Sequence, residues 1–270
     1  MYSPLIISAN GHFLSILLRK GNAHGSWSVI QRLQLVIGEL KKVWPNVNIV
    51  IRIDAGGAIP EIYEFCELNE FKYIIGLITN PNLKKEISKL SEQAEKAFKE
   101  TGEKQQLFGE TQYQAASWSQ SRRSIMKAEH NEKGSNKRFL VTNFEDGTPE
   151  DLYKKEYSPR GDFERIIDDL KNGFSGTRLS CHRLVANNFR LLMSVFQYEL
   201  ISLFKKHCLQ GTEYSTVQPE TLRRAIIKIG ARVKETARRL WFECCSSYPY
   251  KELINLVISR IQKIPIVATC

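Results

Sequence analysis

The stretch that decides the fold is "NVNIVIRIDAGGAIPEIYEFCELNEFKYIIGLI", residues 46–78. Its first nine residues form a β-branched run that predicts a buried strand, with Asp54 at the carboxyl end. A short helix is expected from Pro60 to about Asn69, because proline is favoured in the first turn of a helix. The apolar run 72–78 predicts a second buried strand. Strand, helix and strand in this order are typical of an α/β sheet.

The amino-terminal part extends this pattern. Asn10-Gly11 favours a two-residue type I′ turn, because both residues tolerate positive φ. We therefore expect antiparallel strands at 2–8 and 12–18. Residues 26–44 carry apolar side chains at helical spacing and predict an amphipathic helix before the strand that ends at Asp54. The order of elements again favours an α/β fold.

The pattern changes after the second buried strand. We interpret residues 81–144 as an inserted α+β region, with a charged helix at 82–106 and antiparallel strands within 108–143. The carboxyl-terminal part is mostly helical, and its expected helices span 159–174, 182–206, 219–228 and 250–263. The stretch 231–245 fits either a hairpin or a helix.

Most of the net charge of +10 lies in the last third of the chain. Residues 1–177 contain 24 Lys/Arg against 23 Asp/Glu, whereas residues 178–270 contain 15 against 6. This excess indicates a polyanionic partner for the carboxyl-terminal region. A solvated basic surface without a ligand is the alternative.

Other classes of protein are disfavoured by composition. No apolar run approaches the ~18 residues of a membrane span, and the amino terminus lacks the features of a secretory signal. The six cysteines show no C-x-x-C pair and no metal-ligand spacing with histidine. We therefore expect reduced thiols, no zinc and a cytoplasmic location.

The most specific pattern is "YSPRGDFERIIDDLK", residues 157–171. At ~100° per residue, its helix has one apolar stripe. The stripe consists of Phe163, Ile166, Ile167, Leu170 and Phe174. A second direction holds Arg160, Glu164, Asp168 and Lys171. Ser158 is the expected N-cap and Pro159 the first helical residue, which leaves Tyr157 just outside the helix. The alternative is a surface helix with i,i+4 ion pairs.

These residues resemble a known signature. Tyr157, Arg160, Glu164 and Lys171 have the spacing Y-(2)-R-(3)-E-(6)-K, which is similar to that of one branch of the bacterial insertion-sequence DDE transposases. The segment 51–77 also resembles the region around the second aspartate of that family. Two further segments resemble the regions that follow its glutamate helix. They are "RLSCHRLVANNFRLL" (178–192) and "LRRAIIKIGARV" (222–233).

The resemblance implies a ribonuclease-H-like mixed sheet and specific roles for residues. Asp54 matches the second catalytic acid and Glu164 the third, and both would be metal ligands. In such enzymes three carboxylates hold two Mg²⁺ ions, for which Mn²⁺ can substitute. Tyr157, Arg160 and Lys171 would bind the phosphates of the transposon end. For Asp54, a structural turn before Gly-Gly is the alternative.

Trp118 lies in the inserted region. Insertions in this branch of the family can stack a flipped base, so the resemblance makes Trp118 a candidate DNA-binding residue. A tryptophan packed in the core is the alternative, and it is the more frequent role for this residue type.

The sequence departs from the family at its beginning. The first catalytic aspartate of the family lies on a strand upstream of the hairpin, and no acid precedes Asn10. We therefore expect a core that lacks its first strand and its first acid. The expected domains are an incomplete catalytic core (1–80 and 145–177), the inserted region (81–144) and a basic helical region (178–270).

The function implied by the resemblance is Mg²⁺-dependent cleavage of DNA ends followed by strand transfer. The chain alone is expected to be inactive, because the first acid is missing. The alternative is a non-catalytic DNA-binding remnant or an inhibitor of transposition. DNA is the expected partner, with possible dimerisation on paired ends, a nucleoid location, and neither membrane nor small-molecule cofactor.

Overall fold

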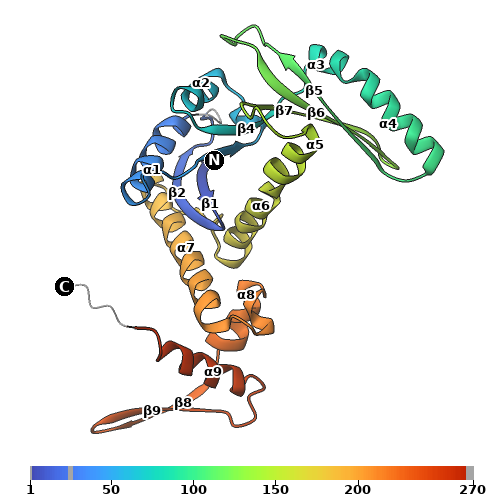
Figure 1. Cartoon of the computed structure of the whole chain (residues 1–270). Coiled ribbons are helices and arrows are strands. Elements are labelled where there is room, and N and C mark those ends of the chain that lie inside the picture. Colours follow the sequence, from blue (N-terminus) through green and yellow to red (C-terminus); the bar gives the residue numbers. More distant parts are fainter. Residues whose placement is uncertain (1, 24–26, 266–270) are drawn as a thin grey trace. The chain divides into compact units, whose positions relative to one another are not determined.

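The computed structural model describes residues 2–23 and 27–265, with residues 160–162 described by their backbone alone. The chain divides into two compact units. The first comprises Met1–Ser8 and Leu14–Phe163, and the second comprises Ala9–Phe13 and Glu164–Cys270. The elements of each unit are labelled in Figure 1.

The chain starts with the predicted hairpin. β1 (Tyr2–Ala9) and β2 (His12–Lys20) form a sheet of their own. Asn10 and Gly11 have φ values of 51° and 85°. Positive φ at both central residues is the geometry of a type I′ turn, so the prediction from Asn10-Gly11 is confirmed.

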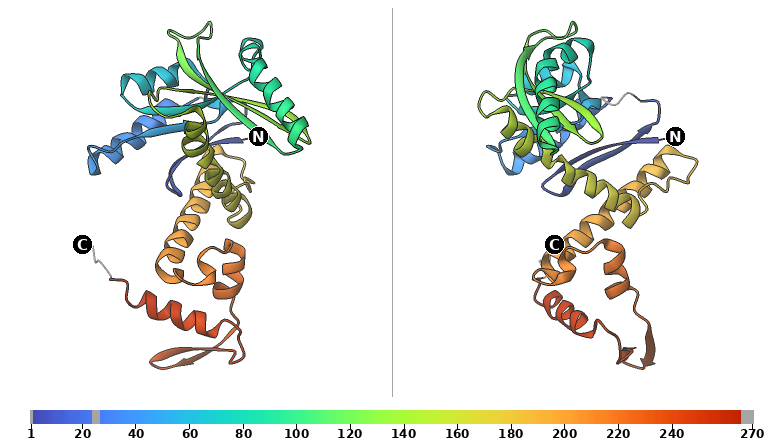
Figure 2. Two further views of the ribbon diagram at one scale, coloured as in Figure 1. Left: turned by 45° about the vertical axis from the view of Figure 1, so that its right-hand side comes forward. Right: turned by 90° about the vertical axis from the view of Figure 1, so that its right-hand side faces the viewer.

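A mixed sheet of five strands forms the centre of the described part of the first unit. Its order is β3-β4-β7-β6-β5, and only β3 and β4 are parallel. The strands are β3 (Val50–Ile53), β4 (Lys72–Leu77), β5 (Gln105–Tyr113), β6 (Arg122–Asn131) and β7 (Gly134–Thr142). β5, β6 and β7 extend well beyond β3 and β4 (Figures 1 and 2). The predicted α/β fold with a mixed sheet is confirmed.

Helical segments pack on both faces of this central sheet. α1 (Val29–Val43) and α2 (Pro60–Leu68) pack with Tyr73 and Ile75 of β4. Ile74, between those two residues, packs against Leu152 on the opposite face. Successive side chains of a strand point to opposite faces, so β4 is buried on both sides. Leu5 and Ile7 of β1 also pack against the α1 and α2 side.

The predicted inserted region forms part of the same sheet. β7 pairs with β4 in antiparallel register, with Val141 opposite Ile75. The expected helix at 82–106 is instead two helices, α3 (Pro81–Glu86) and α4 (Ser88–Thr101). The first strand of the region, β5, begins at Gln105, whereas strands were expected only within 108–143. Only tertiary pairing with β6 fixes this register, and local propensity does not encode it.

A cluster of buried charges lies on β6. Glu129 accepts hydrogen bonds from Gln106 Nε2 at 2.7 Å and from Lys127 Nζ at 2.7 Å, and Lys104 Nζ lies 3.2 Å away. Burial would raise the pKa of the Glu129 carboxyl, but these donors outweigh burial. They lower the pKa of Glu129 from 4.5 to about 2.

This cluster predicts a loss of stability in acid. A carboxyl whose pKa is lower in the folded state stabilises the protein above its unfolded pKa of about 4.3, and the contribution disappears as the pH falls toward 2. The free energy of unfolding, measured by urea denaturation between pH 7 and pH 2.5, should therefore fall more steeply for the wild type than for Glu129→Gln. Equal slopes would show that Glu129 is not responsible.

A long helical segment follows β7, and the prediction that its helix begins at Ser158 and Pro159 is wrong. The segment starts at Pro149, where Thr148 Oγ1 accepts the Asp151 N–H at 3.1 Å. It continues through α5 (Pro149–Asp151), a π-helical turn η2 (Leu152–Tyr157), a 3₁₀ turn η3 (Ser158–Arg160), α6 (Gly161–Asp168) and a second π-helical turn η4 (Asp169–Gly173).

Ser158 is therefore not an N-cap, and Tyr157 lies within the helical segment. Ser158 has helical backbone angles, φ −62° and ψ −30°. Proline removes an N–H and clashes with the carbonyl four residues earlier in a regular α-helix. The change from a π turn to a 3₁₀ turn directly before Pro159 is the type of irregularity that lets the chain pass through proline.

The second unit is mostly helical in its described part. Its elements after η4 are α7 (Leu184–Phe204), η5 (Lys205–Leu209), η6 (Glu213–Ser215), α8 (Pro219–Leu222), η7 (Arg223–Ile227), the ribbon β8 (Ala231–Thr236) and β9 (Arg239–Cys244), and α9 (Lys251–Ile261). Of the two structures that 231–245 allowed, the hairpin is observed. Among the described helices, none combines the length and apolar character that crossing a membrane requires. The described cysteines are free thiols.

The turn of the amino-terminal hairpin belongs to this second unit. Glu199 of α7 accepts a hydrogen bond from the Phe13 N–H at 2.7 Å and lies 2.7 Å from His12 Nδ1. The Tyr198 hydroxyl donates to the Gly11 carbonyl at 3.2 Å, and its ring contacts Phe13 edge to face. The tip of the hairpin is therefore held by one turn of α7.

Candidate functional site

Asp54 stands directly after β3, at the strand end predicted from the sequence. Its Oδ1 accepts the Gly56 N–H at 3.0 Å, and its carbonyl accepts the Gly57 N–H at 3.0 Å. A Cβ atom on Gly57 would lie 2.3 Å from Ile53 Cγ2, so only glycine fits there. This tight turn holds an exposed carboxylate at a defined place at the edge of the sheet.

Tyr157 lies beside the Asp54 turn, and Gly76 of β4 makes this approach possible. A Cβ atom on Gly76 would lie 2.9 Å from the Ala55 nitrogen, 3.0 Å from Tyr157 Oη and 3.3 Å from the Asp54 carbonyl carbon. The Tyr157 hydroxyl and the backbone of Asp54 thus lie beside the same glycine of the first unit. Sequence reasoning did not single out Gly76, although a glycine within an apolar strand often marks a close backbone approach.

The Gly76 contact predicts a destabilising substitution. Gly76→Ala should lower the free energy of unfolding by about 1–3 kcal/mol, because the backbone of the Asp54 turn must move to admit the methyl group. Urea denaturation measures this loss. Gly109→Ala on β5 is the matched control, since its Cβ would meet only side-chain ends, at 3.4 Å and 3.6 Å. Equal effects of the two substitutions would contradict the contact at Gly76.

Glu164 is the exposed fourth residue of α6. Ile166 and Leu170 are buried, as the apolar stripe predicted. Glu164 begins the second unit, whereas Asp54 lies in the first, and the convergence of their carboxylates stays a prediction.

The structure describes the side chain of only one of the two predicted phosphate-binding cations. Lys171 is exposed on the π-helical turn η4, where the wider turn departs from the ~100° spacing used to place it. The side chain of Arg160 lies outside the described residues. Their roles in binding phosphate stay predictions.

Trp118 lies in the core. Only 8% of its surface is exposed, and its ring contacts Tyr63 and Tyr113 edge to face, with centroids 5.3 Å and 5.4 Å away. The guanidinium of Arg122 stacks on it at 5.4 Å. This is the core packing that the sequence left open as the alternative. To stack on a flipped base, Trp118 would have to leave this core packing.

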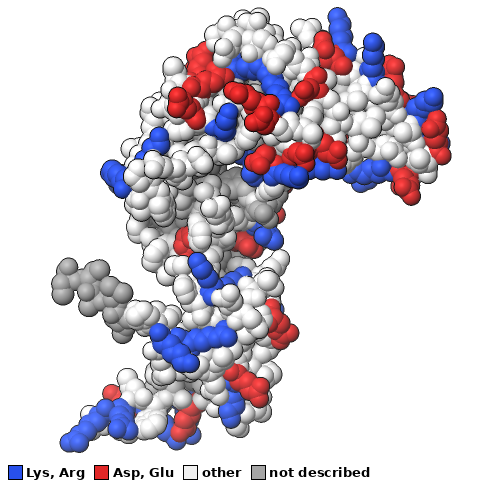
Figure 3. All heavy atoms as spheres, in the orientation of Figure 1, with Lys and Arg blue, Asp and Glu red and all other residues white. Residues whose placement is uncertain are grey.

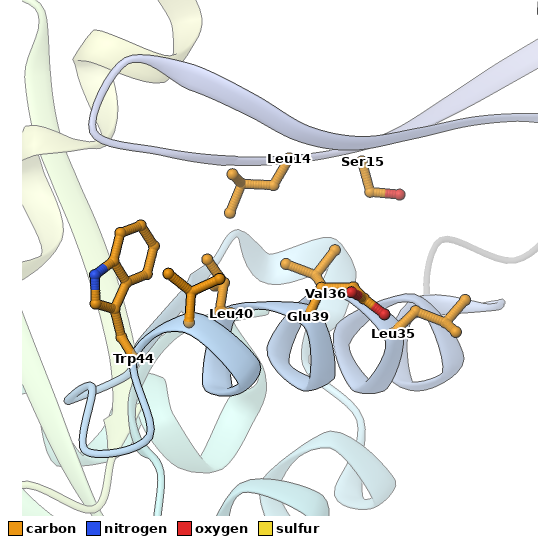
Figure 4. Close-up of a pocket in the computed structure, with 8 residues that line it drawn as sticks. Leu14, Ser15, Leu35, Val36, Glu39, Leu40 and Trp44 are labelled. Carbon is orange, nitrogen blue, oxygen red and sulfur yellow. The ribbon is translucent and has the colours of Figure 1, made fainter. Parts of the chain in front are cut away.

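An apolar groove of about 320 Å³ lies between β2 and α1. Figure 4 shows Leu14 and Ser15 of β2 above side chains of α1, with Trp44 closing one end. Glu39 is its one acidic lining residue among those described, and no predicted site residue contributes to it. The candidate site is therefore the Asp54 turn and not this groove.

Comparison with known families identifies the class of protein. The family model described as "Transposase DDE domain group 1" matches residues 1–266, nearly the whole chain. The chain belongs to this DDE transposase family. A search of curated proteins finds no significant match. The family match supports the predicted relationship to insertion-sequence transposases and gives DNA as the partner.

The residues of this transposase domain fit a divalent metal ion only in part. Carboxylate oxygens are hard donors of the kind that Mg²⁺ prefers, so Asp54 and Glu164 suit the ion by their chemistry. Within the parts of the chain that the structure describes, no group of three or more His, Cys, Asp or Glu side chains could hold a metal ion.

Proposed function

We propose that the chain is the catalytic region of an insertion-sequence transposase that cleaves DNA at the ends of its element and joins them to a target. One observation supports this proposal: the Tyr157 hydroxyl and the backbone of the Asp54 turn both lie beside Gly76 at a strand end, in a chain that a DDE transposase family spans. Asp54 and Glu164 are the proposed second and third acids.

The side chains of this chain have separate tasks in the proposal. Asp54 offers a carboxylate that accepts the Gly56 N–H, within a turn that the Gly57 N–H closes on the Asp54 carbonyl, and Glu164 offers one from a helix. Tyr157, Arg160 and Lys171 bind phosphate oxygens of the DNA end. Bound Mg²⁺ would supply charge stabilisation for the attacking and leaving oxygens.

The proposal requires one more acid, the first of the three, from elsewhere. Neither β1 nor β2 carries an acidic residue, and the hairpin and β3 pack on α1 without being strands of one sheet. We propose that a strand outside residues 1–270 supplies this acid. The chain by itself should then bind DNA without cutting it.

The test is Mg²⁺-dependent nicking of a supercoiled plasmid that carries the DNA flanking the gene. Two proteins are compared: the 270-residue chain, and the same chain extended at its amino end by the translated upstream sequence. Nicking by the extended chain, lost in Glu164→Gln, is the expected result. Nicking by the 270-residue chain would contradict the claim that it lacks a catalytic acid. Absence of nicking by both proteins would contradict the catalytic function.

A non-catalytic DNA-binding protein that inhibits transposition is the second candidate. The absence of an acid on the hairpin and the excess of 15 Lys/Arg over 6 Asp/Glu in residues 178–270 favour it. Adding the 270-residue chain to an active extended chain distinguishes the two roles. An inhibitor should reduce nicking by the extended chain, either by occupying the DNA or by forming a mixed dimer.

A further inference from the structure

The β8–β9 ribbon is a feature of the second unit that the proposed catalytic site does not use. All six residues of each strand are exposed. Two-stranded hairpins are at best marginally stable in water when nothing covers them. An element of this kind is expected to gain stability from a partner.

The two faces of the ribbon differ in chemistry, and the strand register assigns each residue to a face. Directly opposed residues share a face, and the pairs Arg232–Glu243, Lys234–Trp241 and Thr236–Arg239 lie on one side. We call these six residues the basic face. The other side, the apolar face, consists of Ala231, Val233, Glu235, Leu240, Phe242 and Cys244.

Side-chain contacts organise the basic face. The guanidinium of Arg239 lies 5.9 Å from the centroid of the Trp241 ring, which is 51% exposed. Lys234 Nζ lies 2.5 Å from Glu243 Oε1. Since this pair neutralises the one carboxylate on the face, Arg232 and Arg239 provide its net positive charge. Arg238 in the turn adds a further cation, and Figure 3 shows Lys and Arg side chains gathered at the turn end of the ribbon.

We propose that the β8–β9 ribbon is a DNA-binding arm that lays its basic face along the phosphates of duplex DNA, with Trp241 beside the sugars. A two-stranded ribbon fits the major groove of B-DNA. Its cations match the negative charge of the two phosphate backbones. The inference rests on the proposed function only in that DNA is the partner.

Phosphate contacts make a quantitative prediction, because each neutralised phosphate contributes about 0.9 to the slope of log K against log salt. Arg232→Gln/Lys234→Gln/Arg239→Gln should reduce that slope by about 2–3. Between about 50 and 200 mM salt, the fall in affinity should then be roughly 40-fold smaller than for the wild type. The ribbon is exposed throughout, so these substitutions should leave the thermal unfolding curve unchanged.

The experiment is fluorescence anisotropy of the full 270-residue chain with a labelled duplex of about 30 base pairs over this salt range. The control removes the same charge from lysines on α4 and the β6–β7 turn, as Lys96→Gln/Lys99→Gln/Lys133→Gln. The expected result is a reduced slope for the ribbon variant and a slope near that of the wild type for the control. An unchanged slope for the ribbon variant, or equal losses in both, would overturn the proposal.

A second variant tests whether the ribbon instead pairs with another copy of the chain. Val233→Ser/Phe242→Ser changes only the apolar face, where these residues are 56% and 68% exposed. Sedimentation should show the same oligomeric state for this variant and the wild type, with DNA binding retained. Dissociation of an oligomer together with loss of DNA binding would show that the ribbon is a self-association surface. These experiments measure DNA binding and oligomeric state and not nicking. Failure of the catalytic proposal would therefore not affect the test of the ribbon.

Discussion

Replacing Arg122 with leucine should lower the free energy of unfolding by about 3–5 kcal/mol, because the substitution removes one partner of a largely buried ion pair. Arg122 Nε and Nη2 donate to the two carboxylate oxygens of Glu67 at 2.7 Å and 2.8 Å. The Arg122 side chain is only 3% exposed. Its guanidinium also lies 5.2 Å from the Tyr63 ring and 5.4 Å from the Trp118 ring.

The acid dependence of stability gives the same pair a second readout. Burial would raise the pKa of Glu67, but hydrogen bonds from Arg122, Tyr73 and other donors outweigh it, so the pKa lies below its usual value. This carboxylate therefore stabilises the fold above its unfolded pKa and loses its effect as the pH falls through the lowered folded pKa. Arg122→Leu should weaken that acid dependence.

Urea denaturation at pH 7 measures the loss, with Lys99→Gln as control. Lys99 pairs with Glu95 on the surface of α4, where both side chains are largely exposed. Removing such a pair costs about 0.3–0.5 kcal/mol. Similar losses for the two variants would show that the Arg122–Glu67 pair does not hold the α2 side of the sheet together.

The second large effect is expected in catalysis. Asp54→Asn and Glu164→Gln should each reduce nicking by the extended chain by about 10³-fold or more, because each removes a carboxylate worth several kcal/mol to the metal site. Asp168→Asn is the matched control, since Asp168 is exposed on the same helix as Glu164 and has no role in the proposal. It should stay within about two-fold of the wild type. A comparable loss in Asp168→Asn would point to a structural effect of charge on α6.

The fold was predictable where a local signal had one structural meaning. Asn10-Gly11 predicted the turn, because few residues tolerate positive φ at both positions. The β-branched run before Asp54 predicted a buried strand, although β3 is shorter than expected, at Val50–Ile53. β3 pairs with four of the six residues of β4.

Prediction failed where tertiary hydrogen bonding decides between local alternatives. Ser158-Pro159 resembles a helix start in sequence, yet the helical segment begins at Pro149 and passes through it. The sequence indicated strands within 108–143 but not their partners, and β7 pairs with the edge of β4. A strand edge inside a domain must be paired, and the sequence does not show which segment pairs it.

The candidate site was predictable in its parts more than in its arrangement. Asp54 could be singled out in the sequence by its residue type and its place at the end of a strand. The approach of Tyr157 depends on Gly76, whose missing side chain leaves room for both. For Trp118, sequence alone allowed either a core or a DNA-stacking role, because only packing against Tyr63, Tyr113 and Arg122 distinguishes them.

The most direct test of the central claim is a crystal structure of the extended chain grown with Mn²⁺, in which anomalous scattering locates the ion. We predict a peak at about 2 Å from carboxylate oxygens of both Asp54 and Glu164. A peak bound by neither residue, or carboxylates too far apart to share one ion, would contradict the proposed transposase site.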